Sequence, residues 1–213
     1  MRPNRVTVGP LTAASANAIC LSQTPTAGAL TLNGALVSGG VATLDASRRV
    51  LITAAGNESS RTFTLTGTSG SGVVQSETIT GPNATTAQSV LDYKKVTSIT
   101  ISGNAAGAVT VGTSGVASSA WIKFNTWALA QVALQTVASG TVNYTVQQTL
   151  DDPDNSSDPV VITAITWFSH PDSNLVAATG SFQSNYGYPP VFARVLLNSG
   201  TGSVTMTSIQ QGV

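Results

Sequence analysis

Apolar and polar residues alternate over short stretches along most of the chain. In residues 62–66 the alternation places Phe63 and Leu65 on one face, and residues 73–79 repeat it after the glycine-rich stretch 67–72. Successive side chains of a strand point to opposite faces of a sheet, so a period of two predicts half-buried strands. We therefore expect an antiparallel hairpin here, and the same pattern elsewhere predicts an all-β fold.

Asn33 and Gly34 indicate a second hairpin. The pair lies between two short apolar segments, residues 30–32 and 35–37. Asn-Gly suits a two-residue turn because both residues tolerate the positive φ angles that such a turn requires. The sequence thus predicts two strands joined by a tight turn at this point.

The second half of the chain contains bulkier strand patterns. Residues 141–147 alternate, whereas residues 160–168 have the sequence VVITAITWF and are apolar on both faces. An apolar run of this length is typical of a central strand that is covered on both sides. Residues 191–197 and 204–209 flank the polar, glycine-containing stretch 198–202, which predicts a closing hairpin.

Residues 127–137 are ambiguous, because their Ala, Leu and Gln also suit a helix. Short apolar runs do not distinguish the two structures. The stretch Ala-Ser-Gly at residues 138–140 resembles a hairpin turn and favours a strand.

Two folded domains behind an N-terminal arm are expected. Residues 112–119 are small and polar, as in a linker, and residues 1–28 contain three prolines with little alternation. Such a proline-interrupted segment is typical of an extended arm. We predict an arm at residues 1–28 and two tandem β-sandwich domains, immunoglobulin-like or jelly-roll, at residues 29–115 and 116–213.

Charged residues are scarce. They make up 8% of the 213 residues, whereas hydrophobic residues make up 41%, and nine basic residues balance nine acidic ones. A typical globular domain has about 25% charged residues. The low charge suits a protein packed into an assembly, and the balanced charge indicates neither nucleic acid nor a membrane surface as partner.

No segment predicts membrane insertion or secretion. No run of about 18 apolar residues occurs, so no transmembrane helix is expected, and the sequence MRPNRVTVGP has no apolar core of a signal peptide. Cys20 is the one cysteine, so an intramolecular disulfide is impossible and folding in a reducing compartment is the simplest interpretation.

Catalytic chemistry has few candidates. His170 is the one histidine, and Asp172 is near it in sequence, but no nucleophile motif such as G-x-S-x-G accompanies them. Cys20 is expected to be a small buried apolar residue rather than a nucleophile. We expect no catalytic residue, and the chain is predicted not to be an enzyme.

Metal and nucleic-acid sites also lack full patterns. Residues 151–158 hold four aspartates, Asp151, Asp152, Asp154 and Asp158. Calcium prefers such oxygen ligands, but this stretch lacks the sixth-position glycine and the last glutamate of an EF-hand loop. An uncoordinated acidic turn is the favoured interpretation, so no metal or other cofactor is expected. The basic pairs, Arg48 with Arg49 and Lys94 with Lys95, lack the interleaved aromatic residues of a single-strand binding groove.

Aromatic residues supply the contact candidates. Tyr186 and Tyr188 flank a glycine before a proline pair, which would suit either a protein interface or the capped end of a sandwich. Trp121, Trp127 and Trp167 could form a stacking platform for a carbohydrate. Tryptophan in a sandwich core is commoner, and Trp167 lies in a run that is too apolar to be exposed.

Several segments resemble a β-domain of tailed-bacteriophage virion proteins. They are residues 61–83 (RTFTLTGTSGSGVVQSETITGPN), 95–102 (KVTSITIS) and 108–112 (AVTVG). Residues 142–153 (VNYTVQQTLDDP) and 191–198 (VFARVLLN) resemble the C-terminal module that accompanies it. The resemblance implies a structural protein of the phage particle and no enzymatic residues.

Together these patterns predict a virion subunit that binds other structural proteins and itself. The leading hypothesis is a capsid cement, or decoration, subunit that stabilises the lattice of the major capsid protein by apolar contacts and strand addition. A tail, neck or fibre-anchoring subunit is the first alternative. A carbohydrate-binding β-sandwich module is the second, and a hydrolase is a distant third.

Overall fold

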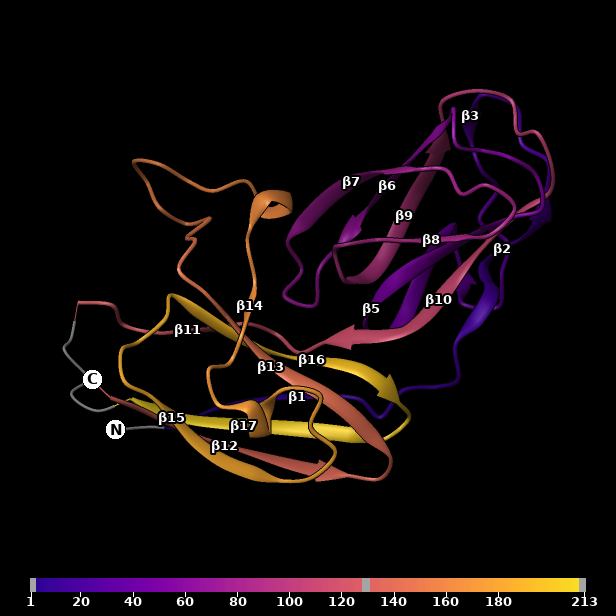
Figure 1. Ribbon diagram of the computed structural model, residues 1–213. Coiled ribbons are helices and arrows are strands. Elements are labelled where there is room, and N and C mark those ends of the chain that lie inside the picture. Colours follow the sequence, from indigo (N-terminus) through magenta and orange to yellow (C-terminus); the bar gives the residue numbers. More distant parts are fainter. Residues whose placement is uncertain (1–2, 128–130, 211–213) are drawn as a thin grey trace. The chain divides into compact units, whose positions relative to one another are not determined.

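The computed structural model describes residues 3–127 and 131–210, and it confirms the all-β prediction, with 55% strand and 3% helix. The chain divides into two compact units, which are drawn in Figure 1. Residues 12–115 form one unit, here called the inserted unit. Residues 1–11 and 116–213 together form the other, here called the split unit.

Nine strands build the inserted unit, the last of which continues into the split unit at Val116. They are β2 (Ser15–Gln23), β3 (Gly28–Ala29), β4 (Val37–Ser38), β5 (Val41–Ala54), β6 (Thr62–Thr68), β7 (Val74–Thr80), β8 (Thr86–Gln88), β9 (Tyr93–Ile101) and β10 (Val109–Ser118).

An antiparallel sheet with the order β10-β5-β9-β6-β7 organises the inserted unit. Strands β6 and β7 pair with Phe63 opposite Ile79, as the predicted hairpin requires, so that prediction is confirmed. Phe63 and Leu65 are fully buried, and they stand opposite Ile101 and Ile99 of the neighbouring strand β9. Alternation thus places one face of the hairpin in the core.

The predicted hairpin at Asn33 and Gly34 is wrong. Both backbone N–H groups donate to the carbonyl oxygen of Ile19, so the pair lies against strand β2. A Cβ atom at Gly34 would lie 2.2 Å from the carbonyl oxygen of Ala18. Glycine is therefore needed here for the close approach of two backbones rather than for a turn.

The predicted N-terminal arm is also wrong. Strand β1 (Asn4–Val8) pairs antiparallel with Ser203–Gln210 of the split unit, and β2 pairs with β10 of the inserted unit. Val8, Ile19 and Cys20 are buried. Pro3 precedes β1, Pro10 lies between β1 and β2, and Pro25 follows β2. The prolines therefore interrupt the pattern without preventing the pairing.

The split unit holds the remaining elements. They are β1, β11 (Ile122–Lys123), β12 (Val132–Ser139), β13 (Val142–Thr149), the 3₁₀ helix η1 (Ile162–Ala164), β14 (Phe168–Ser169), the 3₁₀ helix η2 (Ser173–Leu175), β15 (Phe182–Tyr186), β16 (Phe192–Gly200) and β17 (Ser203–Gln210). The interpretation of residues 127–137 as a strand is confirmed for the part within β12, whereas residues 128–130 lie outside the described residues.

Two sheets contribute to the split unit. One has the order β1-β17-β12-β15, and in the other β13 pairs with both β14 and β16. The turns after β12 and after β16 carry the chain from one sheet to the other, so residues 191–197 and 204–209 do not form the predicted hairpin. Instead β16 pairs with β13, and β17 pairs with β12 and β1. In these pairings most apolar side chains of β16 and β17 are buried.

The predicted central strand at residues 160–168 does not form. The segment contains η1, none of whose residues is buried, and reaches a strand only at its last residue, Phe168, which begins β14. No strand of the described chain pairs with residues 160–167. Apolar sequence alone favours a buried strand, but a strand also needs a partner for its backbone groups.

Candidate interaction surface

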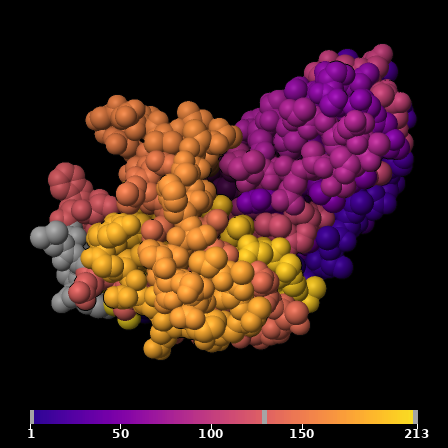
Figure 2. All heavy atoms as spheres, viewed as in Figure 1, coloured from indigo at the N-terminus to yellow at the C-terminus, as the bar shows by residue number. Residues whose placement is uncertain are grey.

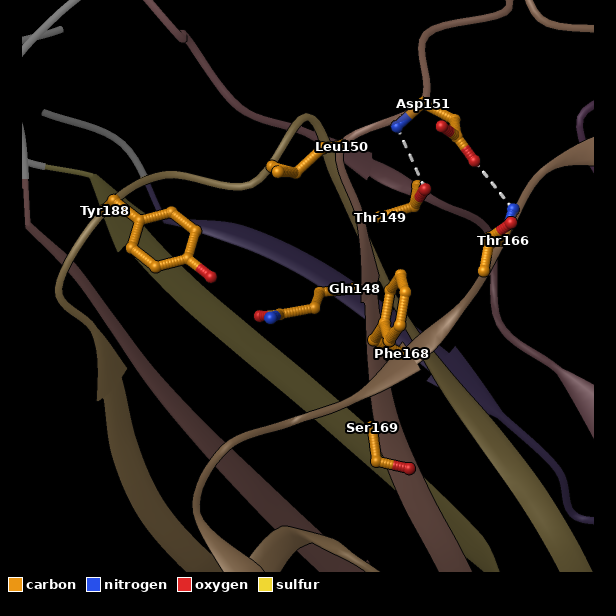
Figure 3. Close-up of a pocket in the computed structure, with 8 residues that line it drawn as sticks. All are labelled: Gln148, Thr149, Leu150, Asp151, Thr166, Phe168, Ser169 and Tyr188. Atoms are coloured by element: carbon orange, nitrogen blue, oxygen red, sulfur yellow. Dashed lines mark hydrogen bonds between the residues drawn. The ribbon is translucent and has the colours of Figure 1, made fainter.

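A hollow of about 400 Å³ lies in the split unit (Figure 3). The residues that line it come from the end of β13, from β14, from the loop between these strands and from the segment after β15. They are Gln148, Thr149, Leu150, Asp151, Thr166, Phe168, Ser169 and Tyr188. This volume lies within the range of about 300–1,000 Å³ that is typical of small-molecule sites.

Two aromatic rings line the hollow without being buried. Phe168 is 62% exposed and Tyr188 is 54% exposed. Phe168 stands directly opposite Gln148 in the pairing of β13 with β14, which brings the ring and the amide to the same face. Figure 3 shows the side chains of Gln148 and Tyr188 pointing toward each other across the hollow.

Hydrogen bonds fix the polar wall of the hollow. A carboxylate oxygen of Asp151 accepts from the backbone N–H of Thr166 at 2.7 Å, and the Asp151 N–H donates to the hydroxyl of Thr149 at 3.0 Å. The side-chain oxygen of Gln148 is buried and has no hydrogen-bond partner among the described residues. Hydrogen bonds thus order the polar wall of the hollow, whereas the Gln148 oxygen is enclosed by the protein.

The loop between β13 and β14, residues 150–167, is here called the projecting loop. In Figure 2 it stands out from the rest of the split unit as the orange segment before β14. Val161 is 67% exposed, and Leu150 is exposed to a similar degree. Apolar side chains therefore face solvent where the sequence predicted a buried strand.

The acidic turn lies within the projecting loop and bonds to itself and to one lysine. The Lys123 ammonium lies 3.3 Å from a carboxylate oxygen of Asp152 and 3.0 Å from one of Asp154. The hydrogen bond to Asp154 raises the pKa of Lys123. In residues 3–127 and 131–210 no group of three or more His, Cys, Asp or Glu side chains is placed to hold a metal ion.

His170 is buried beside Tyr186, with the ring centroids 4.4 Å apart. Its Nδ1 accepts a hydrogen bond from the backbone N–H of Asp172 at 3.0 Å. The Asp172 carboxylate instead accepts from the N–H of Asn174 and from the hydroxyl of Ser184. In a catalytic triad the carboxylate would accept from Nδ1–H, so this arrangement is a different one. Burial lowers the pKa of His170 and favours the neutral ring.

Cys20 lies inside the inserted unit. It is fully buried in β2 opposite Val111 of β10. Burial raises the pKa of its thiol to about 12, so the thiolate required of a nucleophile is disfavoured.

The basic pairs of the inserted unit bind its own backbone. The guanidinium of Arg48 is buried and donates to the carbonyl oxygens of Ser114 and Thr12. It also donates to both carboxylate oxygens of Asp45, at 3.1 and 3.0 Å. The Lys94 ammonium donates to the carbonyl oxygens of Leu44 and Asp45. Arg48 is therefore placed to join β5 to β10 and to the segment at Thr12, and Lys94 to join β9 to β5.

The tryptophans do not form a common platform. Trp121 packs edge-on against Trp167, with ring centroids 5.0 Å apart, and the Arg194 guanidinium lies 4.1 Å from the centre of the Trp167 ring. Trp127 is 97% exposed and is not among the residues of the hollow. The exposed rings of the hollow are Phe168 and Tyr188 instead.

Sequence reasoning found one of these two rings. It named Tyr186 and Tyr188 together, but the structure buries Tyr186 and exposes Tyr188. It placed Phe168 in a buried strand and did not consider Gln148. The alternation of residues 141–147 ends just before Gln148. The end of this alternation is the one feature of the local sequence that indicates a different environment for Gln148.

No protein-family model matches the chain, and neither a curated protein nor a solved structure shows significant similarity to it. None of the helices in the described part of the chain is long and apolar enough to cross a membrane.

Proposed function

We propose that this protein is a structural subunit of a tailed-bacteriophage particle, that it binds other virion proteins and that it catalyses no reaction. The leading form of the proposal is a cement subunit on the lattice of the major capsid protein. Each unit would then be a β-sandwich, immunoglobulin-like or jelly-roll, that presents its surface to neighbouring subunits. The resemblance of residues 61–83 and 142–153 to phage virion proteins supports this proposal.

The exposed apolar side chains of the projecting loop are the observation that carries the proposal. Val161 and Leu150 face solvent on a segment that stands out from its unit. A partner protein that covers this segment would remove both side chains from water. Complete burial of one valine or leucine side chain contributes about 1.5–3 kcal/mol. A few such side chains can therefore hold a subunit in an assembly.

The low charge of the chain supports the same conclusion. Charged residues make up 8% of the sequence, so apolar burial and backbone pairing would dominate the binding. Ion pairs between exposed groups are screened at about 1 M salt, where the Debye length is roughly 3 Å. Binding to the particle should persist at that salt concentration.

Purified particles provide the test. Quantitative mass spectrometry should find the protein in hundreds of copies, close to the number of major capsid proteins. A small number that fits a single ring would favour the tail, neck or fibre-anchoring alternative. Absence from the particle would overturn the structural proposal.

A substitution in the projecting loop tests the surface itself. Val161→Asp should reduce binding to particles that lack the protein at least about tenfold, because it places a charge in an apolar contact. Val74→Asp is the matched control, since Val74 is exposed to 74% but belongs to the inserted unit. Equal binding by the two variants would exclude the projecting loop as the docking surface.

A further inference from the structure

We propose that the hollow lined by Phe168, Tyr188 and Gln148 binds a neutral saccharide. This inference goes beyond the proposed function and does not depend on it. Its two rings, Phe168 and Tyr188, lie outside the projecting loop, although Leu150, Asp151 and Thr166 of that loop also line the hollow. It also places the contact on different residues from the tryptophans that the sequence suggested.

The two rings provide the apolar part of the site. Phe168 and Tyr188 are more than half exposed although each is large enough to contribute substantially to a core. An exposed ring in a concave site offers a flat apolar surface of fixed orientation. The C–H face of a pyranose ring is flat and apolar in the same way, so it can stack on such a ring.

The polar groups provide the rest of the site. Gln148, Ser169 and Tyr188, whose side chains carry an amide and two hydroxyl groups, belong to the same lining. Asp151 is held in place by its bond to Thr166. Amides, hydroxyls and a carboxylate are the donors and acceptors that match sugar hydroxyl groups.

The combination of apolar rings and polar groups favours a saccharide over an apolar side chain of a partner protein as the ligand of the hollow. A leucine or phenylalanine that filled the hollow would cover the polar groups of its lining without giving them hydrogen bonds. Covering a polar group in this way costs about 1–3 kcal/mol. A sugar ring can satisfy the polar groups and stack on the rings at the same time.

The charge of the hollow favours a neutral sugar. Asp151 is the one charged residue in its lining, and Asp152 and Asp154 lie close to it in sequence and are paired with Lys123. A carboxylate repels an acidic sugar and accepts hydrogen bonds from the hydroxyl groups of a neutral one. We therefore expect no binding of sialylated or uronic-acid ligands at this site.

Ligand-observed saturation-transfer NMR with the full chain tests the proposal. The probes are maltohexaose, cellohexaose, laminarihexaose and chitohexaose, with sialyllactose as the acidic comparison. We expect at least one neutral probe to bind and sialyllactose not to bind. If no neutral probe binds, or if sialyllactose binds best, the proposal is wrong.

Variants locate the binding. Phe168→Ala and Tyr188→Ala should each weaken the affinity of the bound probe about tenfold, while both variants keep the melting temperature of the unaltered chain, because the two rings are exposed. Tyr188→Phe should keep most of the affinity, since it retains the ring. Trp127→Ala is the aromatic control outside the hollow and should change nothing. Binding that survives loss of both Phe168 and Tyr188 would place the saccharide elsewhere and overturn the assignment.

Discussion

The two units differ in how many charged groups they bury and in where exposed aromatic rings lie. The inserted unit buries Arg48, Glu58 and Asp92, whereas Arg194 is the one buried Arg, Lys, Asp or Glu among the described residues of the split unit. Arg48 bonds to strand β10, and Glu58 bonds to the loop before that strand. The split unit carries the large aromatic residues that are exposed in the described chain, Trp127, Phe168 and Tyr188. The inserted unit thus uses its buried charges for internal hydrogen bonds and ion pairs, and the split unit exposes aromatic rings that could contact a ligand or partner.

Glu58 is an example of a buried charge that is bound within the inserted unit. One of its carboxylate oxygens accepts from the backbone N–H groups of Ala106 and Gly107, at 2.7 and 3.1 Å. The other lies 3.4 Å from the guanidinium of Arg61. A buried charge remains stable only when it is paired and hydrogen-bonded, and this site meets both conditions. The comparison teaches that a low overall charge does not mean that the few charges are unimportant.

The largest effect should follow from removing Arg48. Arg48→Met removes the buried guanidinium that donates to the carbonyl oxygens of Ser114 and Thr12, whereas the exposed Asp45 carboxylate keeps its hydrogen bonds to Thr12. A hydrogen bond to a charged group contributes about 1.5–3 kcal/mol, so the loss of two should cost about 3–5 kcal/mol. Urea unfolding should show this loss in the inserted unit, whereas Lys95→Met, which removes an exposed charge from the same unit, should change stability by less than about 0.5 kcal/mol. Similar results for both variants would refute the role assigned to Arg48.

A smaller loss is expected from Glu58→Ala, which leaves the N–H groups of Ala106 and Gly107 without their acceptor. The expected cost is about 2–3 kcal/mol in the free energy of unfolding. Glu58→Gln keeps an acceptor oxygen and should lose less. Thermal unfolding of the three proteins side by side measures the difference, and an alanine variant as stable as the glutamine variant would contradict this account.

Two buried tyrosines of the split unit form a matched pair. The Tyr144 hydroxyl donates to the carbonyl oxygen of Gly180 at 2.8 Å and lies 2.6 Å from the Thr136 hydroxyl, whereas the Tyr186 hydroxyl is buried without a hydrogen-bond partner among the described residues. Tyr144→Phe should therefore cost about 1 kcal/mol, and Tyr186→Phe should be neutral or stabilising. Denaturant titration separates the two outcomes. A larger loss at Tyr186 would show that its hydroxyl has a partner.

The smallest effect should be a pH dependence confined to the split unit. Burial lowers the pKa of His170 below its ordinary value of 6.5, with the charge of Asp172 opposing the shift. The unfolded chain takes up a proton as the pH falls through 6.5, while the folded chain does not. Stability is therefore complete above this pH and declines below it until the folded pKa is reached.

Melting curves between pH 7.5 and 5 test this expectation, with His170→Asn as the control that removes the titrating ring. The unaltered split unit should lose stability over this range, and the variant should lose less. The inserted unit contains no histidine, so its transition should not follow that of His170. An equal decline in the variant would assign the pH dependence to other groups.

The sequence correctly predicted structural elements that are determined by residues close together in the chain. The β6–β7 hairpin was predicted because alternation and a glycine-rich turn both lie within residues 62–80. The apolar run at 160–168 gave the wrong result, since periodicity does not reveal whether a partner strand exists. Phe168 itself pairs with β13, but the residues before it have no partner strand and leave its ring uncovered, so this half of the hollow could not be predicted. Tyr188 could be named because glycine and proline mark its exposed turn locally.

The position of β1 has a consequence for the order of events during synthesis. Thr7 of β1 lies beside Thr205 of β17, 198 residues later in the chain. At a translation rate of about 5–20 residues per second, β1 waits roughly 10–40 s for this partner. Residues 12–115 are complete well before then and can fold first. The nascent chain therefore carries an unpaired strand through most of its elongation, and a chaperone that masks residues 4–8 would protect it from misassembly.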